Sequence, residues 1–119
     1  MNQVAVGSVD DFVEGQIRVV EAAGKEVGVL RWNGELFAVR NVCPHRGAPV
    51  CAGIVSPYIE AEAGSLRLDR DRPILACSWH RWEFDVRTGQ ALTDPARLRT
   101  YPVSVGDDGQ VLLELRAAQ

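Results

Sequence analysis

Two short motifs in this chain bring together the residue types that bind soft and borderline metal ions. The first is Cys43-Pro44-His45 and the second is Cys77-Ser78-Trp79-His80; together they contain both histidines and two of the three cysteines of the sequence. Thiolates and imidazoles are the ligands of structural zinc sites and of some iron–sulfur clusters. We therefore expect these four side chains to form one metal centre, rather than two surface histidines beside two small buried cysteines.

Two kinds of centre match this ligand set. Zinc takes two Cys and two His in a tetrahedral structural site, and a 2Fe–2S cluster can take two His in place of two Cys on one iron. Zinc motifs tend to pair Cys with Cys and His with His, whereas each motif here supplies one of each. A chain of 119 residues also buries enough surface to fold without a metal. These points favour the cluster, and a structural zinc domain acting as a binding module remains the alternative from a different class.

The elements that carry the motifs are expected to be β-strands. Val, Ile and Leu dominate the apolar residues, glycines punctuate the chain, and no segment sustains a helical period. Asn33-Gly34 is typical of a tight hairpin turn, and residues 9–13 could form one helical turn. The sequence therefore predicts an all-β protein with strands in these ranges: 16–20, 27–32, 35–40, 74–76, 82–86, 99–105 and 111–115.

The pattern loosens between the two motifs. Residues 56–72 contain Pro57, Gly64 and a run of Arg and Asp, so we interpret them as a polar insertion that forms a solvated loop or a short hairpin. No repeat or linker-like change in composition divides the chain. We expect a single domain over residues 1–119.

Composition excludes several functions and sets a compartment. The net charge is -3, and no cluster of cations is present to neutralise the phosphates of a nucleic acid. The apolar runs are too short to cross a membrane, and the N-terminal residues do not resemble a secretion signal. An odd number of cysteines argues against a disulfide framework. We expect a cytoplasmic protein that binds neither nucleic acid nor membrane.

Taken together, the motifs resemble the two cluster-binding loops of Rieske iron–sulfur proteins. The segments that carry the resemblance are Cys43-Pro44-His45-Arg46-Gly47-Ala48-Pro49, Cys77-Ser78-Trp79-His80, Trp82-Glu83-Phe84-Asp85 and Thr88-Gly89. The resemblance covers nearly the whole chain. It implies stacked antiparallel β-sheets with a cluster-binding subdomain of two loops, residues 43–51 and 77–85, at one tip.

The resemblance also implies roles for individual residues. Cys43 and Cys77 would bind the buried iron of one 2Fe–2S cluster, and His45 and His80 would bind the outer iron. Gly47 would allow the backbone to approach a sulfide, the tryptophans would exclude water, and the arginines would be docking cations or ordinary solvated charges. The residues expected around the cluster are Arg46, Gly47, Trp79, Arg81, Trp82 and Pro95, the last in a third, shielding loop that begins at Asp94.

Three departures from the family pattern leave the ligands intact. Ser78 stands where Pro is common, Arg81 stands where Gly is common, and 31 residues separate His45 from Cys77. We attribute the long separation to the insertion at residues 56–72.

The resemblance further implies a low-potential electron carrier. The respiratory branch has an extra disulfide and places hydroxyl groups near the cluster, in positions that Trp82 and Phe84 occupy here. Because hydrogen bonds to the sulfurs raise the potential, we expect a midpoint of about -150 mV. Both histidines are committed to the cluster, so the chain has none left for the mononuclear iron of an oxygenase. Cys51 is expected to be a free thiol rather than a nucleophile.

The sequence thus predicts a Rieske-type ferredoxin, an electron-transfer component of a dioxygenase system with no catalytic residues of its own. It would pass electrons from a flavin reductase to a terminal oxygenase, and both partners would dock at the tip that carries His45 and His80. The alternative within the family is a small Rieske subunit of a larger reductase, such as a nitrite reductase.

Overall fold

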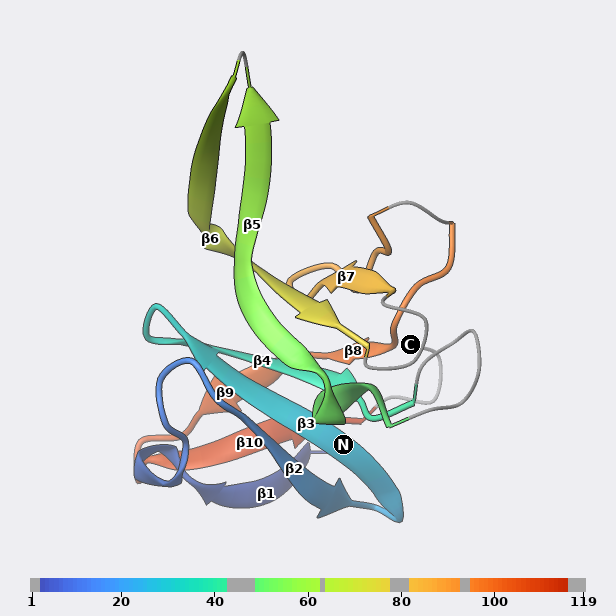
Figure 1. Ribbon diagram of the computed structural model, residues 1–119. Helices are drawn as coiled ribbons and strands as arrows, with labels where there is room; N and C mark the ends of the chain where they lie inside the picture. The colour runs from blue at the N-terminus through green and yellow to red at the C-terminus, as the bar shows by residue number, and fades with distance from the viewer. Residues whose placement is uncertain (1–2, 43–48, 63, 78–81, 93–94, 116–119) are drawn as a thin grey trace.

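The computed structural model describes residues 3–42, 49–62, 64–77, 82–92 and 95–115. Within them the chain forms three antiparallel sheets, shown in Figure 1, and two short 3-10 helices. The strands are β1 (Gln3–Ser8), β2 (Ile17–Ala22), β3 (Lys25–Trp32), β4 (Glu35–Arg40), β5 (Ile54–Glu62), β6 (Ser65–Ala76), β7 (Glu83–Asp85), β8 (Thr100–Tyr101), β9 (Val103–Val105) and β10 (Gln110–Glu114). The 3-10 helices are η1 (Val9–Asp11) and η2 (Val50–Ala52). The expected all-β architecture of stacked antiparallel sheets is confirmed.

The central sheet has the order β2-β3-β4-β8 and contributes to two apolar cores. Side chains alternate between the faces of a strand, so Val27 and Val29 of β3 enter one core and Leu30 enters the other. The same division separates Ala38 from Val39 on β4. A sheet buried on both faces explains why β3 and β4 are apolar at consecutive positions.

The two outer sheets complete these cores. The sheet with the order β1-β10-β9 contributes Val111 and Leu113 to the first core. The sheet with the order β5-β6-β7 contributes Leu75 and Phe84 to the second. We call this second cluster the upper core. Its buried members are Leu30, Val39, Cys51, Leu75, Cys77, Phe84, Val86, Ala91 and Leu98. It positions the candidate site.

The predicted meander is present. β2, β3 and β4 pair in sequence, and the β3–β4 turn places Asn33 at φ 53° and Gly34 at φ 77°, the conformation that the Asn-Gly pair favours. The predicted helical turn is η1, capped by Ser8, whose side chain accepts a hydrogen bond from the Asp10 N–H. The closing hairpin is β9 with β10, but residues 100–101 form β8 and pair with β4 instead.

Of the two forms predicted for residues 56–72, a solvated loop or a short hairpin, the structure shows the hairpin, and it is longer than expected. These residues belong to β5 and β6, which pair from Ile54 with Ala76 to Glu62 with Ser65. They build a long hairpin that rises away from the rest of the molecule in Figure 1. The register shifts after Pro57, where three extra residues of β6, 70–72, face none of β5. Part of the signal was in the sequence, because apolar and charged residues alternate on both sides of the turn.

No helix in the described part of the chain is long and apolar enough to cross a membrane.

Candidate metal centre

Cys77 lies at the end of β6, where the strand enters the second motif. Its side chain is 1% exposed and belongs to the upper core together with Leu75 and Phe84. Its backbone N–H donates a hydrogen bond of 2.8 Å to the carbonyl oxygen of Trp82. This bond joins the described residues on either side of the segment 78–81, at the end of β6 and next to β7.

The first motif is closed at its base by a side chain. Asn41, directly after β4, is buried, and its Oδ1 accepts a hydrogen bond of 2.8 Å from the backbone N–H of Cys51. Its Nδ2 donates to the Glu26 carboxylate at 3.2 Å, and its N–H donates to the Glu26 carbonyl at 2.9 Å. Asn41 thereby joins the two ends of the first loop and fixes both to β3. The sequence analysis did not single out Asn41. Its position, as a polar residue between an apolar strand and the first Cys/His motif, could have indicated a structural role.

A third segment is held beside the second motif. The Leu92 N–H donates to the carbonyl of Glu83 at 3.0 Å, and the Ala91 N–H donates to the carbonyl of Ala96 at 3.1 Å. Pro95 is exposed within this segment. The chain on both sides of residues 93–94 is therefore held next to β7, and the shielding role of this segment stays a prediction.

The three segments start from one apolar core. Cys51 ends the first loop, Cys77 begins the second, Ala91 precedes the third, and all three are buried in the upper core. Their common origin brings the bases of all three loops together, although the motifs are far apart in sequence.

Three of the ten predicted site residues fall in the described part of the chain: Cys77, Trp82 and Pro95. The others lie outside the described residues: Cys43, His45, Arg46, Gly47, Trp79, His80 and Arg81. Among the described residues no group of three or more His, Cys, Asp or Glu side chains could hold a metal ion. The structure of those residues thus offers no second metal centre that competes with the two motifs.

Aromatic residues make the base of the second motif apolar. Phe84 is fully buried, Trp82 is half-buried against the upper core, and their ring centroids are 6.3 Å apart with planes tilted by 34°. Neither side chain carries a hydroxyl. Buried Cys77 and this aromatic pair form the dry environment that suits a thiolate ligand of a buried iron, so the described residues fit the cluster that the ligand set implies.

Cys51 is not one of the four predicted ligands, and its thiol is weakly acidic. It is free and buried, and burial, together with the negative charge of Glu26, raises the pKa of its thiol to about 12 against a hydrogen bond with Gly28 that lowers it. A thiol this weakly acidic stays protonated and unreactive at neutral pH. The interpretation of Cys51 as a free thiol rather than a nucleophile is consistent with this environment.

Comparison with known protein families places this fold and these motifs in one class. The model of the Rieske [2Fe-2S] domain matches residues 2–102. The chain belongs to the Rieske [2Fe-2S] domain family, and its cofactor is a Rieske-type 2Fe–2S cluster. It is 35% identical over 117 residues to the ferredoxin component of the p-cumate 2,3-dioxygenase system of Pseudomonas putida, an alignment that covers 96% of this chain and 86% of the relative.

Solved structures agree on the fold. The ferredoxin of carbazole 1,9a-dioxygenase from Nocardioides aromaticivorans IC177 superposes with a TM-score of 0.74 at 26% identity, covering 98% of this chain and all of that one. A chain in a complex of reduced oxygenase and oxidised ferredoxin of carbazole 1,9a-dioxygenase superposes with a TM-score of 0.73 at 25% identity. The superposition covers 95% of this chain and 93% of that one. A protein described as a nitrite reductase small subunit of Mycobacterium tuberculosis shares the fold, with a TM-score of 0.75 at 24% identity. The superposition covers 97% of this chain and 96% of that one.

Proposed function

We propose that this chain is the ferredoxin component of a dioxygenase system and carries one electron at a time from a flavin reductase to a terminal oxygenase. The observation that carries the proposal is the pair of Cys/His motifs whose bases start from one apolar core, in a chain of this family. The bound cluster supplies a site that accepts and releases one electron. The chain holds it, limits water around it and presents it to partners.

Four ligands are part of the proposal. Cys43 and Cys77 hold the inner iron, and His45 and His80 hold the outer iron. The burial of Cys77 supports its place on the inner side. The hydrogen bonds that close the loops, from Cys51 to Asn41 and from Cys77 to Trp82, support a rigid ligand frame that reorganises little when an electron arrives.

The partners follow from the relatives. Both the p-cumate and the carbazole proteins are named as ferredoxins of dioxygenase systems, and a related ferredoxin has been solved with its oxygenase. The tip that carries His45 and His80 is the docking surface for both partners. The net charge of -3 suits a basic partner surface, so electron transfer should slow as salt is added.

A cytoplasmic location belongs to the same proposal. Cys51 is a free, buried thiol, which is typical of proteins kept in a reducing compartment.

The small subunit of a nitrite reductase is the second candidate. It is favoured by the fold it shares with the Mycobacterium tuberculosis protein, but that likeness extends to the fold alone. The dioxygenase ferredoxin is better supported, because the relative at 35% identity is a ferredoxin component. Membership of the Rieske family sets the zinc-binding alternative aside.

Reconstitution tests the proposed function. The chain, a flavin reductase and a terminal oxygenase purified from the same source organism should together oxidise the oxygenase's substrate, and omission of the chain should stop turnover. Activity with a nitrite reductase large subunit and none with the oxygenase would favour the second candidate.

The ligand assignment has its own test and a matched control. Replacement of any of the four ligands by Ala should abolish the cluster's visible absorption, whereas Cys51→Ala should retain it. Retention of a normal cluster after His80→Ala or Cys43→Ala would overturn the assignment.

A further inference from the structure

The β5–β6 hairpin carries an apolar face that the rest of the chain does not cover. Leu66 and Leu68 lie two residues apart on β6 and therefore share a face, and Ile59 lies opposite Leu68 in the register, on that same face. Their side chains are exposed by 76%, 49% and 56% respectively. Three large aliphatic groups thus lie together on one exposed face rather than scattered singly, which makes this face a candidate interaction surface.

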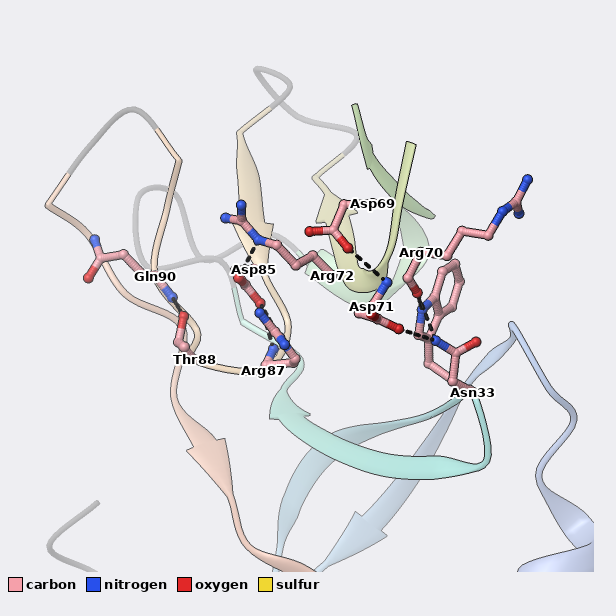
Figure 2. A network of polar contacts seen from close by, with 10 residues as sticks. Asn33, Asp69, Arg70, Asp71, Arg72, Asp85, Arg87, Thr88 and Gln90 are labelled. Atoms are coloured by element: carbon pink, nitrogen blue, oxygen red, sulfur yellow. Dashed lines mark hydrogen bonds and ion pairs between the residues drawn. The ribbon is translucent and has the colours of Figure 1, made fainter. Parts of the chain in front are cut away.

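This hairpin has a fixed orientation. At its base, the carbonyl oxygen of Arg70 accepts hydrogen bonds from Trp32 Nε1 at 2.6 Å and from Asn33 Nδ2 at 2.8 Å. On the other side Arg72 lies 3.5 Å from the Asp85 carboxylate and stacks over the ring of Tyr58 at 4.1 Å. Figure 2 shows the Asn33 contacts and the Arg72 ion pair on either side of the β6 bulge. The β3–β4 turn and β7 therefore hold the hairpin from two sides, and its apolar face is held in place relative to the body.

The apolar face continues toward the loops that carry the cluster. Ile59 lines a groove of about 300 Å³ together with Ser56, Pro57, Tyr58, Ile74, Glu83 and Leu92. Glu83 comes directly after Trp82, which follows the second motif. Leu92 directly precedes residues 93–94 of the third loop. The two are joined by the hydrogen bond from the Leu92 N–H to the Glu83 carbonyl. The groove thus connects the hairpin with the bases of two loops at the docking tip.

The size of the patch indicates its occupant. Three partly exposed aliphatic side chains offer a few hundred Å² at most, whereas a stable complex buries about 800 Å² on each partner. Two hairpins packed together would fall short of a stable dimer. As an extension of an existing contact at the tip, however, the patch suits a transient electron-transfer complex, which buries less than a stable one.

Of the two redox partners, the oxygenase is the one that this apolar face is expected to recognise. Both use the same histidine tip, so a surface outside the ligand motifs is needed to distinguish them. The similar ferredoxins belong to systems whose dioxygenases act on different compounds, p-cumate and carbazole. The oxygenase is therefore the partner against which such a surface is expected to be matched.

We propose that the face formed by Ile59, Leu66 and Leu68, together with the groove below it, docks an apolar surface of the terminal oxygenase. This inference rests on the proposed function and adds to it the surface that selects the oxygenase. The hairpin contributes affinity and alignment, while the electron leaves through the histidine tip.

The test compares the double variant Leu66→Ser with Leu68→Ser against a matched control, Val13→Ser with Val105→Ser. The control residues are also exposed aliphatic side chains, by 56% and 48%; Val13 lies between η1 and β2, and Val105 lies on β9. With the purified oxygenase, the hairpin variant should raise the KM for ferredoxin about tenfold, the loss of roughly one hot-spot contact, and leave kcat within about twofold. Reduction by the reductase should be unchanged, as should the electron-paramagnetic-resonance spectrum, and the control should behave as wild type.

Other outcomes overturn the inference. An unchanged KM for the oxygenase would show that the face is not used. An equal loss in the reductase and oxygenase steps would point to damage at the tip, and a wild-type dimer that the variant converts to a monomer would make a second copy the occupant. If the wild-type chain supports neither step, the proposed function itself fails and this inference fails with it.

Discussion

The thiol of Cys51 occupies the space that a side chain at Gly28 would need. A Cβ atom at Gly28 would overlap the Cys51 Sγ and come within 2.9 Å of the Ile17 side chain. Only glycine fits at position 28, because Cys51 of η2 packs directly against this residue of β3. This contact ties the end of the first cluster loop to the central sheet, alongside the hydrogen bond from the Cys51 N–H to Asn41.

Gly28→Ala should destabilise the protein by overpacking. We expect a loss of about 1–3 kcal/mol, seen as a thermal midpoint lowered by several degrees. The double variant Gly28→Ala with Cys51→Ala removes the atom that the new methyl group meets. It should be more stable than the sum of the two single effects predicts. Simple additivity of the two substitutions would contradict the packing that the structure shows.

The environment of Cys51 predicts a pH dependence. Its pKa of about 12 lies above the unfolded value of 9.0, so the fold favours the protonated thiol. The contribution of the protonated thiol to the free energy of unfolding is complete below pH 9 and is lost as the pH rises through 12. Alkylation of Cys51 by iodoacetamide, followed by mass spectrometry, should be negligible in the native protein at pH 9 and rapid in the unfolded chain. Rapid native alkylation at pH 9 would show that the thiol is neither buried nor weakly acidic.

Asn41 should control the lifetime of the cluster. Asn41→Ala leaves the buried N–H of Cys51 without its acceptor, at a cost of about 1–3 kcal/mol, and frees the base of the first loop. Visible absorbance in the presence of a chelator should therefore decay faster than in the wild type. Asn33→Ala is the matched control, because Asn33 bonds to Arg70 and Asp71 at the base of the hairpin. Equal decay in both variants would deny Asn41 this role.

Hydroxyl groups near the second motif should raise the reduction potential. The wild-type midpoint is expected at about -150 mV, near the low end of the Rieske range. Phe84→Tyr introduces a donor at the base of the motif and should shift the midpoint upward. Phe12→Tyr makes the same change in the other apolar core and should leave it unmoved. Protein-film voltammetry checks both, and a wild-type midpoint well above zero would refute the explanation.

Several features of the fold could be predicted from local sequence. The strand Glu35–Arg40 and the Asn33-Gly34 turn followed from alternation and turn chemistry, and the structure has both. The two Cys/His motifs could be singled out as the candidate site because cysteines and histidines are scarce in this chain. These signals depend only on residues that are close together in the sequence, so they can be recognised in a single sequence.

Features that depend on distant contacts could not be predicted in the same way. The sequence allows a short hairpin at residues 56–72, but the bulge of β6 is held by distant contacts, those of Trp32 and Asn33 with the Arg70 carbonyl. The role of Asn41 depends on Cys51, ten residues away, and on Glu26 in another strand. Pairing of β8 with β4 depends on the stacking of whole sheets, which no local pattern encodes.

Iron and acid-labile sulfide analysis of the purified chain, with an electron-paramagnetic-resonance spectrum after reduction by dithionite, would show whether the chain binds a Rieske cluster. We expect about two irons and two sulfides per chain, the content of a 2Fe–2S cluster, a red-brown colour and the signal of a reduced Rieske centre. A colourless protein that holds zinc and no sulfide, or that binds no metal at all, would contradict it.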